Sequence, residues 1–231
     1  MGKLAELIGL APEGGRLAFG ILIVGLILLF AGFPLLGLFV VLVAVAVGSF
    51  FRDPERFPER SDGVVISAAD GKVTDIAQCP LPDDRETVYH RVSVFMSPLN
   101  VHVNRASAAG EVTMVEHTPG DFFAAYRDSA SEQNERNLIV IRDAAGRRHA
   151  IMQIAGYLAR RIICRVHPHD KVEMGQRIGL IMFGSRVDHF IPSDYRVTVR
   201  VGERVLAGET VIGELLGEDN ESKSGIAARP S

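Results

Sequence analysis

The distribution of apolar and polar residues divides the chain into two unlike parts. Residues 17–51 contain no charged side chain and are rich in Leu, Val, Ile, Phe, Ala and Gly. A single membrane-spanning helix needs about 20 apolar residues, so this stretch is long enough for more than one helix. Pro34 lies near its middle, where it breaks or kinks a helix. The pattern predicts either one kinked helix or a hairpin of two short helices, residues 17–33 and 35–51.

Basic residues flank this apolar stretch on both sides, Lys3 and Arg16 before it and Arg52 and Arg56 after it. Basic flanks favour the cytoplasmic side of a membrane, and a hairpin returns both flanks to one side. We therefore expect a hairpin in the cell membrane, with the rest of the chain on the cytoplasmic face. A secretory signal peptide is the alternative, because residues 44–46 resemble a cleavage site, but its apolar region would far exceed the usual length of about 7 to 15 residues.

The remainder of the chain shows the pattern of short β-strands. Runs rich in β-branched residues are separated by Gly, Pro and Asp, which favour turns. These runs are residues 64–67, 72–76, 88–95 and 138–141. One short helix is expected between residues 121 and 135. The predicted fold class is mainly β (α+β), preceded by the helical hairpin.

Glycine spacing is similar in residues 172–179 and 201–213, as expected for tight turns between very short strands. Together with the Ala-Asp-Gly-Lys-Val sequence at residues 69–73, this sequence pattern resembles that of the barrel sandwich of biotinyl and lipoyl domains. We expect four segments in the chain. They are a membrane-embedded helical segment at 1–51, a linker at 52–62, a β domain at 63–216 and a disordered tail at 217–231.

Charge and composition argue against several functional classes. The formal net charge is -3 and the isoelectric point is near 6.2, which lacks the basic bias of a nucleic-acid-binding protein. Cys79 and Cys164 are too few for a disulfide scaffold or a cysteine-rich metal site, and they fit a reducing compartment. Nucleotide-binding glycine loops and the H-E-x-x-H motif do not occur. The polar cluster at residues 167–170 contains two histidines, but in a proline-containing turn we expect it to be solvated, and no metal site is predicted.

Gly184 and Ser185 form the pair most suggestive of chemistry. A serine hydroxyl can attack the peptide carbonyl that precedes it, and a glycine there leaves access open and tolerates a strained backbone. On its own, a Gly-Ser pair is more typical of an ordinary turn between strands. The surrounding sequence must therefore decide between the two interpretations.

Six ordered blocks of sequence together resemble the short (archaeal-like or bacterial) form of the phosphatidylserine decarboxylase proenzyme family. The resemblance covers roughly residues 50 to 215. The blocks are residues 50–54, 67–73, 95–105, 134–137, 153–162 and 182–188.

The resemblance implies a self-made cofactor, pyruvate in the form of a pyruvoyl group. Ser185 would attack the carbonyl of Gly184, β-elimination would break the chain, and the resulting dehydroalanine would hydrolyse to the pyruvoyl group with loss of ammonia. The pyruvoyl ketone would form a Schiff base with the amine of phosphatidylserine and accept the electron pair left by carbon dioxide, giving phosphatidylethanolamine. The family implies that the two fragments, residues 1–184 and 185–231, stay together as a heterodimer. A higher oligomer is left open.

The resemblance also places Asp70 and His102 as an acid/base pair around Ser185. A histidine near neutrality can take the serine proton, and a carboxylate can hold its ring. Longer members of the family have a second histidine three residues after the first, where this chain has Arg105. Which histidine is the base for cleavage therefore stays open, and His189 is the next candidate.

Arg160 and Arg161 are candidates for binding the lipid phosphate. On a strand they would face opposite sides, so at most one of them is expected to reach the lipid.

Two alternatives remain. The first is a membrane-anchored, non-enzymatic adaptor module of the biotinyl or lipoyl type. A carrier of that kind needs a lysine in its hairpin turn, and residues 183–188 contain none. The second is the same decarboxylation acting on archaetidylserine, a lipid with the same headgroup.

Overall fold

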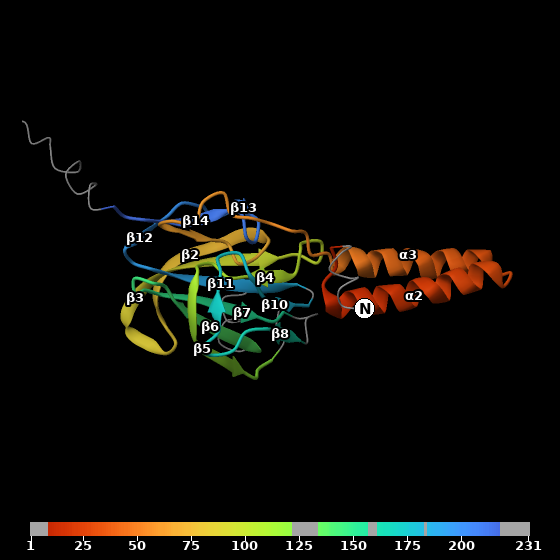
Figure 1. The fold of residues 1–231 in the computed structure, drawn as a ribbon, viewed down its shortest axis with the longest axis horizontal. Coiled ribbons are helices and arrows are strands. Elements are labelled where there is room, and N and C mark those ends of the chain that lie inside the picture. The colour runs from red at the N-terminus through yellow and green to blue at the C-terminus, as the bar shows by residue number, and fades with distance from the viewer. Residues whose placement is uncertain (1–8, 122–133, 157–160, 183, 218–231) are drawn as a thin grey trace, which may run out of the picture.

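The computed structural model describes residues 9–121, 134–156, 161–182 and 184–217. It begins with two helices, α2 (Pro12–Phe30) and α3 (Pro34–Phe50), which lie antiparallel and project from one end of the β domain (Figure 1). Pro34 is the first residue of α3, a position at which its missing N–H is not needed. The expectation of two short helices separated near Pro34 is confirmed.

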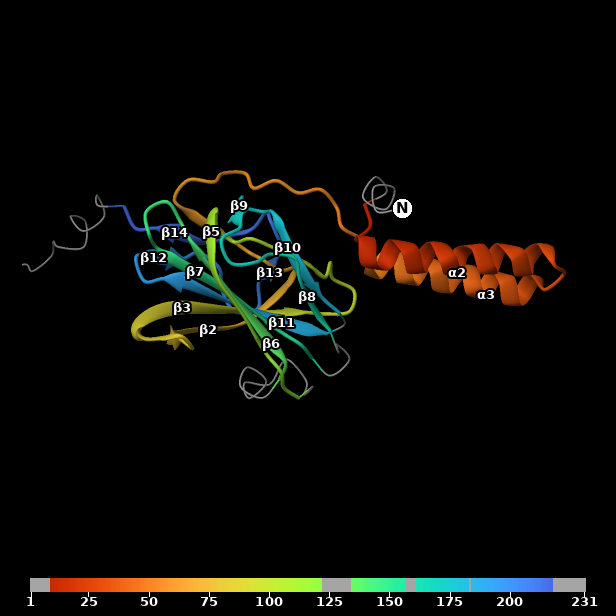
Figure 2. The same ribbon diagram turned by 60° about the horizontal axis from the view of Figure 1, so that its bottom comes forward.

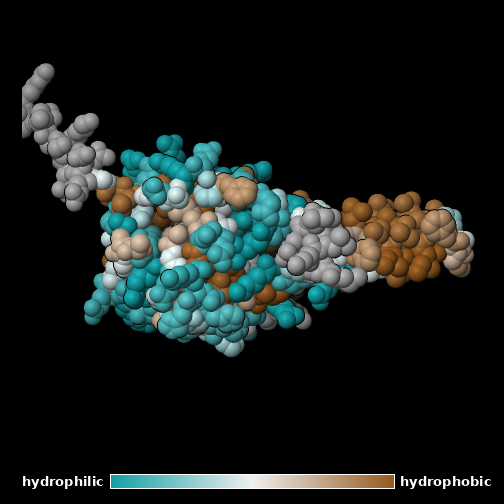
Figure 3. All heavy atoms as spheres, in the orientation of Figure 1, coloured by the Kyte–Doolittle hydropathy of each residue, from teal (hydrophilic) through white to brown (hydrophobic). Residues whose placement is uncertain are grey.

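Close packing of the two helices depends on small residues at their contact. A Cβ atom added to Gly37 would lie 2.6 Å from the backbone nitrogen of Leu29, and one added to Gly25 would lie 2.8 Å from a methyl carbon of Val41. The outer surface of the pair is apolar, with Phe30 90% and Leu35 85% exposed near the tip (Figure 3). By length and composition, α2 is suited to cross a membrane, whereas α3 has 17 residues and is shorter.

Short antiparallel strands make up most of the remaining described chain, which confirms the mainly β fold class. They are β1 (Val64–Ile66), β2 (Gly71–Leu81), β3 (Asp84–Met96), β4 (Val103–Arg105), β5 (Gly110–Thr118), β6 (Arg136–Arg142), β7 (Arg148–Ile154), β8 (Ile162–Cys164), β9 (Lys171–Val172), β10 (Arg177–Ile181), β11 (Ser185–Pro192), β12 (Tyr195–Val197), β13 (Arg204–Val205) and β14 (Val211–Leu215).

One curled sheet of eight strands dominates the domain, in the order β13-β2-β3-β11-β7-β6-β5-β9. Two smaller sheets, β1-β14-β12 and β4-β10-β8, pack against it, as the turned view shows (Figure 2). The main core contains side chains from all three sheets, including Val65, Val94 and Ile181. Strand β11 lies in the middle of the large sheet, hydrogen-bonded to β3 on one side and to β7 on the other. Ser185, which begins β11, pairs with Met96 of β3, and pairing with β7 begins at the next residue, Arg186.

The similar glycine-rich stretches form β9 and β10 in one case and β13 and β14 in the other. Gly175, Gly202 and Gly208 have φ values of 80°, 95° and 81°, in the left-handed region that favours glycine, so they act as the expected turn residues. The helix expected between residues 121 and 135 falls almost entirely outside the described residues, as does the tail after residue 217.

The segment between the helices and the first strand has no regular structure but is tied to the β domain by ion pairs. The buried carboxylate of Asp53 accepts hydrogen bonds from Arg105 at 3.1 Å and from Arg177 at 2.6 Å. Arg56 forms an ion pair with Asp70. These contacts fix the path of the chain from the hairpin to the β domain.

Candidate active site

Ser185 is the first residue of β11 and pairs with Met96, the last residue of β3. Its side chain is 0% exposed, and its hydroxyl oxygen lies 3.5 Å from the sulfur of Met96. A thioether is a weak acceptor, so this contact holds the hydroxyl without strongly engaging it. Gly184 has a φ of +56°, a conformation that side chains disfavour, and no heavy atom lies within 4 Å of where its Cβ would be. The peptide bond between the two residues thus joins a left-handed turn to a fixed central strand.

A chain of buried amide side chains lies beside Ser185. Asn104 donates to the Met96 sulfur at 3.7 Å, and its carbonyl oxygen accepts from Gln153 at 2.9 Å. Gln153 in turn accepts from Asn137 at 3.0 Å. All three amides are buried and come from β4, β7 and β6. They supply neutral hydrogen-bonding groups that hold Met96 and the adjoining strands in register.

None of these three amides is predicted to be functional from its local sequence. Asn104, Asn137 and Gln153 fall within three of the family-like blocks, so the blocks contained the signal. Because the three residues are far apart in sequence, only their packing shows that they form one connected network.

His102 lies directly before β4 and beside the segment that leads to Ser185. Its carbonyl oxygen accepts a hydrogen bond from the Ile181 backbone at 3.3 Å. The preceding turn is fixed by Asn100, whose side chain accepts from the Ser97 backbone and hydroxyl at 2.9 and 2.7 Å. The imidazole of His102 is 2% exposed and lies against Phe50, with ring centroids 4.2 Å apart.

Burial lowers the pKa of His102 to about 4, and the positive charge of Arg52 acts in the same direction. The backbone of Asn100 and the charge of Asp70 oppose this shift less strongly. Within the described residues, neither ring nitrogen makes a hydrogen bond of normal geometry. His102 is therefore a neutral imidazole near pH 7, with a ring nitrogen available to accept a proton.

Asp70 lies in the turn between β1 and β2, where it is engaged by Arg56. The guanidinium contacts both carboxylate oxygens, at 3.0 Å for Oδ2, and the backbone N–H of Ala207 donates to Oδ1 at 2.8 Å. The expectation that a carboxylate would hold the His102 ring is not met among the described contacts. Arg56 and Ala207 occupy the carboxylate, and the aromatic ring of Phe50 packs on the imidazole instead. Asp70 acts on His102 only through its charge.

His189 is fixed by two backbone contacts. Its Nε2 accepts from the Ala68 N–H at 2.8 Å, and its Nδ1 lies 3.0 Å from the Val92 carbonyl oxygen. Burial lowers the pKa of His189 to about 4. Both ring nitrogens are occupied, so His189 is a poor alternative base.

Arg105 stands where longer family members have a second histidine. It is buried and binds the Gly175 carbonyl at 2.9 Å, the Pro54 carbonyl at 2.8 Å and the Asp53 carboxylate at 3.1 Å. Its role here is to hold the segment that follows the hairpin.

Of the two arginines considered for lipid binding, Arg160 lies outside the described residues. Arg161 is exposed, and its carbonyl oxygen accepts from the Met182 backbone at 3.3 Å. Arg161 thus borders the segment that leads to Gly184.

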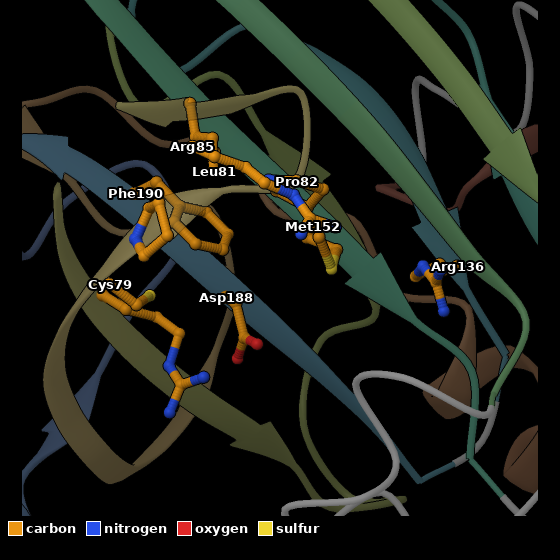
Figure 4. A pocket seen from close by; sticks show the side chains of 10 residues that line it. Cys79, Leu81, Pro82, Arg85, Arg136, Met152, Asp188 and Phe190 are labelled. Atoms are coloured by element: carbon orange, nitrogen blue, oxygen red, sulfur yellow. The ribbon is translucent and has the colours of Figure 1, made fainter. Parts of the chain in front are cut away.

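The opposite face of β11 carries a second polar group. Arg186 and Asp188 form a buried ion pair, with Nε and Oδ1 2.8 Å apart. Asp188 also lines a pocket of about 450 Å³ together with Arg91 and Arg136 (Figure 4). Side chains alternate along a strand, so this pocket and the Ser185 side chain lie on opposite faces of the sheet. Among the described residues, no group of three or more His, Cys, Asp or Glu side chains is arranged to hold a metal ion.

Comparison with known proteins gives a consistent result. Residues 43–213 match the family described as phosphatidylserine decarboxylase. A protein of Desulfotalea psychrophila named phosphatidylserine decarboxylase proenzyme is 44% identical over 167 residues, 72% of this chain and 78% of that protein. Proteins with the same name from Chlorobium chlorochromatii and Mycolicibacterium smegmatis are each 48% identical, over 71% and 74% of this chain and 76% and 75% of their own lengths.

Proposed function

The chain belongs to the phosphatidylserine decarboxylase family, and on this premise we propose that it cuts itself between Gly184 and Ser185 and then converts phosphatidylserine to phosphatidylethanolamine. The observation that carries the proposal is the geometry of this pair. A buried serine begins a central strand directly after a glycine in the left-handed conformation. Gly184 has no side chain to shield its carbonyl, and the pairing of Ser185 with Met96 holds the nucleophile in place.

In self-cleavage, the Ser185 oxygen bonds to the Gly184 carbonyl carbon while the bond to the Ser185 nitrogen breaks, giving an ester and a free amine. Removal of the Ser185 Cα proton then expels the Gly184 carboxylate. The remaining dehydroalanine takes up water and loses ammonia, leaving a ketone at residue 185. Each of these steps needs a group that can carry a proton.

We assign proton transfer to His102, which is neutral and lies across from Ile181 on the neighbouring strand segment. Asp70 stabilises the positive charge that His102 acquires, because its own charge favours protonation of the imidazole. Asp70 and His102 interact through their charges, and no hydrogen bond joins the two side chains among the described contacts. Asp70 therefore supports His102 as the proton carrier, while Arg56 fixes the position of the Asp70 carboxylate.

The two fragments would remain together after cleavage. Residues 185–231 include β11, which pairs with β3 and β7, and also β13 and β14, which pair with β2 and β1. These strands belong to sheets shared with the larger fragment. The product is a heterodimer in which the new N-terminus stays fixed beside Met96 and Asn104.

When formed, the pyruvoyl group supplies a carbonyl that binds the substrate amine and withdraws electrons from the bond to the departing carboxylate. His102 returns a proton to the product carbon, and the buried amide network holds the strands around the site in place. Arg161, at the exposed edge of the site, is our candidate for the lipid phosphate.

The helical hairpin would place this chemistry at its substrate. Its apolar outer surface suits the lipid bilayer, and the β domain would lie on the cytoplasmic face. We retain the division into a membrane segment at 1–51, a connecting segment at 52–62, a decarboxylase domain at 63–216 and a tail from 217.

Purified full-length protein and its Ser185→Ala variant test the proposal. The wild-type chain should give two fragments on a denaturing gel, with masses for residues 1–184 and for 185–231 carrying a pyruvoyl N-terminus. It should release carbon dioxide from phosphatidylserine vesicles, while the variant stays whole and inactive. Archaetidylserine vesicles in a parallel assay define the lipid chains accepted. Recovery of a free serine amine at residue 185, or activity in an uncut chain, would refute the mechanism.

A further inference from the structure

The base of the helical hairpin packs directly against β4, β10 and the residues just before β4, which include His102. We call this contact the hairpin foot. It is a cluster of buried apolar side chains from both parts of the chain. Its members are Ala11, Phe50, Phe51, Val101, Val103 and Leu180, with Val47, Ile163 and Met182 at the margin.

Polar contacts fix the hairpin foot on both helices. Glu13 in the first turn of α2 forms a two-pronged ion pair with Arg165, at 2.6 and 3.2 Å. Arg52, just after α3, donates to the Ser49 carbonyl at 2.7 Å and to the carbonyl of Leu99. Leu99 belongs to the turn that leads to His102. The hairpin is therefore held to the β domain at the site itself.

Phe50 makes the closest aromatic contact with the candidate base. Its ring and the His102 imidazole are 4.2 Å apart between centroids and tilted by 34°, and both side chains are buried. Neither imidazole nitrogen makes a hydrogen bond of normal geometry among the described residues, although the Asn100 backbone lies near the ring, so the contact with Phe50 is the main packing restraint on the imidazole. A carboxylate usually performs this task for a catalytic histidine.

We propose that Phe50 is a positioning residue for His102, so that the segment anchoring the protein in the bilayer also orients its proton carrier. This inference rests on the proposed role of His102 in self-cleavage and decarboxylation. Phe50 covers one face of the imidazole and limits its rotation. It also keeps water away, which favours the neutral form that can accept a proton.

One consequence concerns the boundary at residue 51. Deleting residues 1–50 would remove Phe50 together with the membrane helices. Loss of self-cleavage in such a truncated chain would therefore reflect damage to the site as well as loss of membrane attachment. Point variants of the full-length chain separate the two effects.

The first experiment measures self-cleavage of newly synthesised full-length protein in detergent micelles. Phe50→Ala should slow cleavage about 10- to 100-fold, because misplacing a reacting group by about 1 Å can have an effect of that size. Phe50→Tyr, which keeps the ring, should restore most of the rate. Phe39→Ala is the matched control, since Phe39 lies on the same helix and is 63% exposed.

The second experiment does not depend on activity. In uncut Ser185→Ala protein, NMR of labelled histidines follows the His102 titration, and the signal is assigned by its loss in His102→Gln. The groups facing His102 are Arg52, Asp70 and the Asn100 backbone, and all of them are unchanged by substitution at Phe50. His102 should titrate near pH 4 with Phe50 present and closer to pH 6.5 in Phe50→Ala, with no change in Phe39→Ala.

Phe50→Leu covers the case in which the alanine variant does not fold, because it keeps apolar volume but removes the ring. It should also slow cleavage, whereas the His102 titration point should change less than in Phe50→Ala, because leucine keeps the surroundings of the imidazole apolar. Wild-type cleavage rates in folded Phe50→Ala or Phe50→Leu would overturn the proposal. If the unsubstituted chain does not cleave, the proposed function fails. An unchanged His102 titration in folded Phe50→Ala would separately overturn the positioning role.

Discussion

Ser185 and Met96 face each other across the paired ends of β11 and β3, with the serine hydroxyl 3.5 Å from the methionine sulfur. The candidate nucleophile is thus packed against a soft, weakly accepting atom. The bulk of the Met96 side chain and the pairing of β11 with β3 position the Ser185 hydroxyl, which stays available for reaction.

Because Met96 packs against Ser185, we expect the volume of the Met96 side chain to matter more for self-cleavage than its sulfur atom. Met96→Leu should change the rate of self-cleavage by less than about threefold, with a stability loss below about 1.5 kcal/mol. Met96→Ala should destabilise the protein by about 2 to 5 kcal/mol and slow cleavage by leaving a cavity beside Ser185. Gel time courses and thermal unfolding measure both effects. A strong cleavage defect in Met96→Leu would show that the sulfur itself contributes.

His102→Ala should slow self-cleavage, decarboxylation or both by about 100- to 10,000-fold, the usual effect of losing a positioned proton carrier. His167→Ala is the control, because His167 is 83% exposed and lies between β8 and β9. Fragment formation and carbon dioxide release are measured separately. Normal rates of both in His102→Ala would require another residue to carry the proton, and the occupied nitrogens of His189 make it a poor substitute.

Asp70→Asn should slow self-cleavage, because it removes the charge that favours protonation of His102. It should also destabilise the protein, because Asp70 is the ion-pair partner of Arg56. Removing one member of a buried ion pair destabilises a protein by about 3 to 5 kcal/mol, and both side chains are less than 10% exposed here. The matched control is Asp75→Asn, which disrupts a more exposed pair with Arg91 and should change stability by about 1 kcal/mol or less.

The two effects of Asp70→Asn can be separated by combining it with Arg56→Met, which removes the unpaired charge. Stability measured by thermal unfolding should recover in the double variant, while slow self-cleavage should persist. Recovery of both stability and cleavage would mean that Asp70 has only a structural role.

The tip of the hairpin should control membrane attachment independently of cleavage. Aspartate at both Phe30 and Leu35 places charges on its most exposed apolar positions. A charge deep in a bilayer costs about 3 kcal/mol, so flotation with lipid vesicles should fall sharply. Self-cleavage in detergent should stay unchanged, because the hairpin foot is intact. Phe57→Asp, at an exposed position outside the helices, should alter neither property.

Stability should fall as the pH is lowered from 7 to 5. Burial lowers the pKa of His102 and of His189 to about 4, whereas a histidine in the unfolded chain titrates near 6.5. The unfolded chain therefore binds these two protons first as the pH falls, which favours unfolding over the range from about 6.5 down to about 4. Each histidine should reduce the free energy of unfolding by about 2 kcal/mol at pH 5.

Urea denaturation of uncut Ser185→Ala protein in detergent, followed by circular dichroism, measures this pH dependence. Replacing His102 by Gln should remove the contribution of that histidine, about 2 kcal/mol at pH 5. A free energy of unfolding that is equal at pH 7 and pH 5 would contradict the prediction.

Local sequence pattern determined the features that depend on short stretches of chain. The uncharged run interrupted by Pro34 predicted either one kinked helix or two short helices, and the basic residues on both sides of it favoured two, because helix formation and termination depend on neighbouring residues. The β-branched runs between turn residues predicted β1, β2, β3 and β6 for the same reason, although β2 and β3 are longer than expected. The Gly184-Ser185 pair was recognisable as a candidate only together with the family-like blocks around it, although the two groups proposed to react are adjacent in the chain.

Tertiary structure alone decided how the remaining site residues are used. Phe50 meets His102 across 52 positions of sequence, Asp70 pairs with Arg56 in the connecting segment, and His189 is bonded to the Ala68 backbone 121 positions away. Residue types permitted several partners for each of these groups. The choice among them follows from strand register and from the packing of the hairpin foot, which bring distant residues within a few ångströms and leave each buried polar group only the partners that reach it.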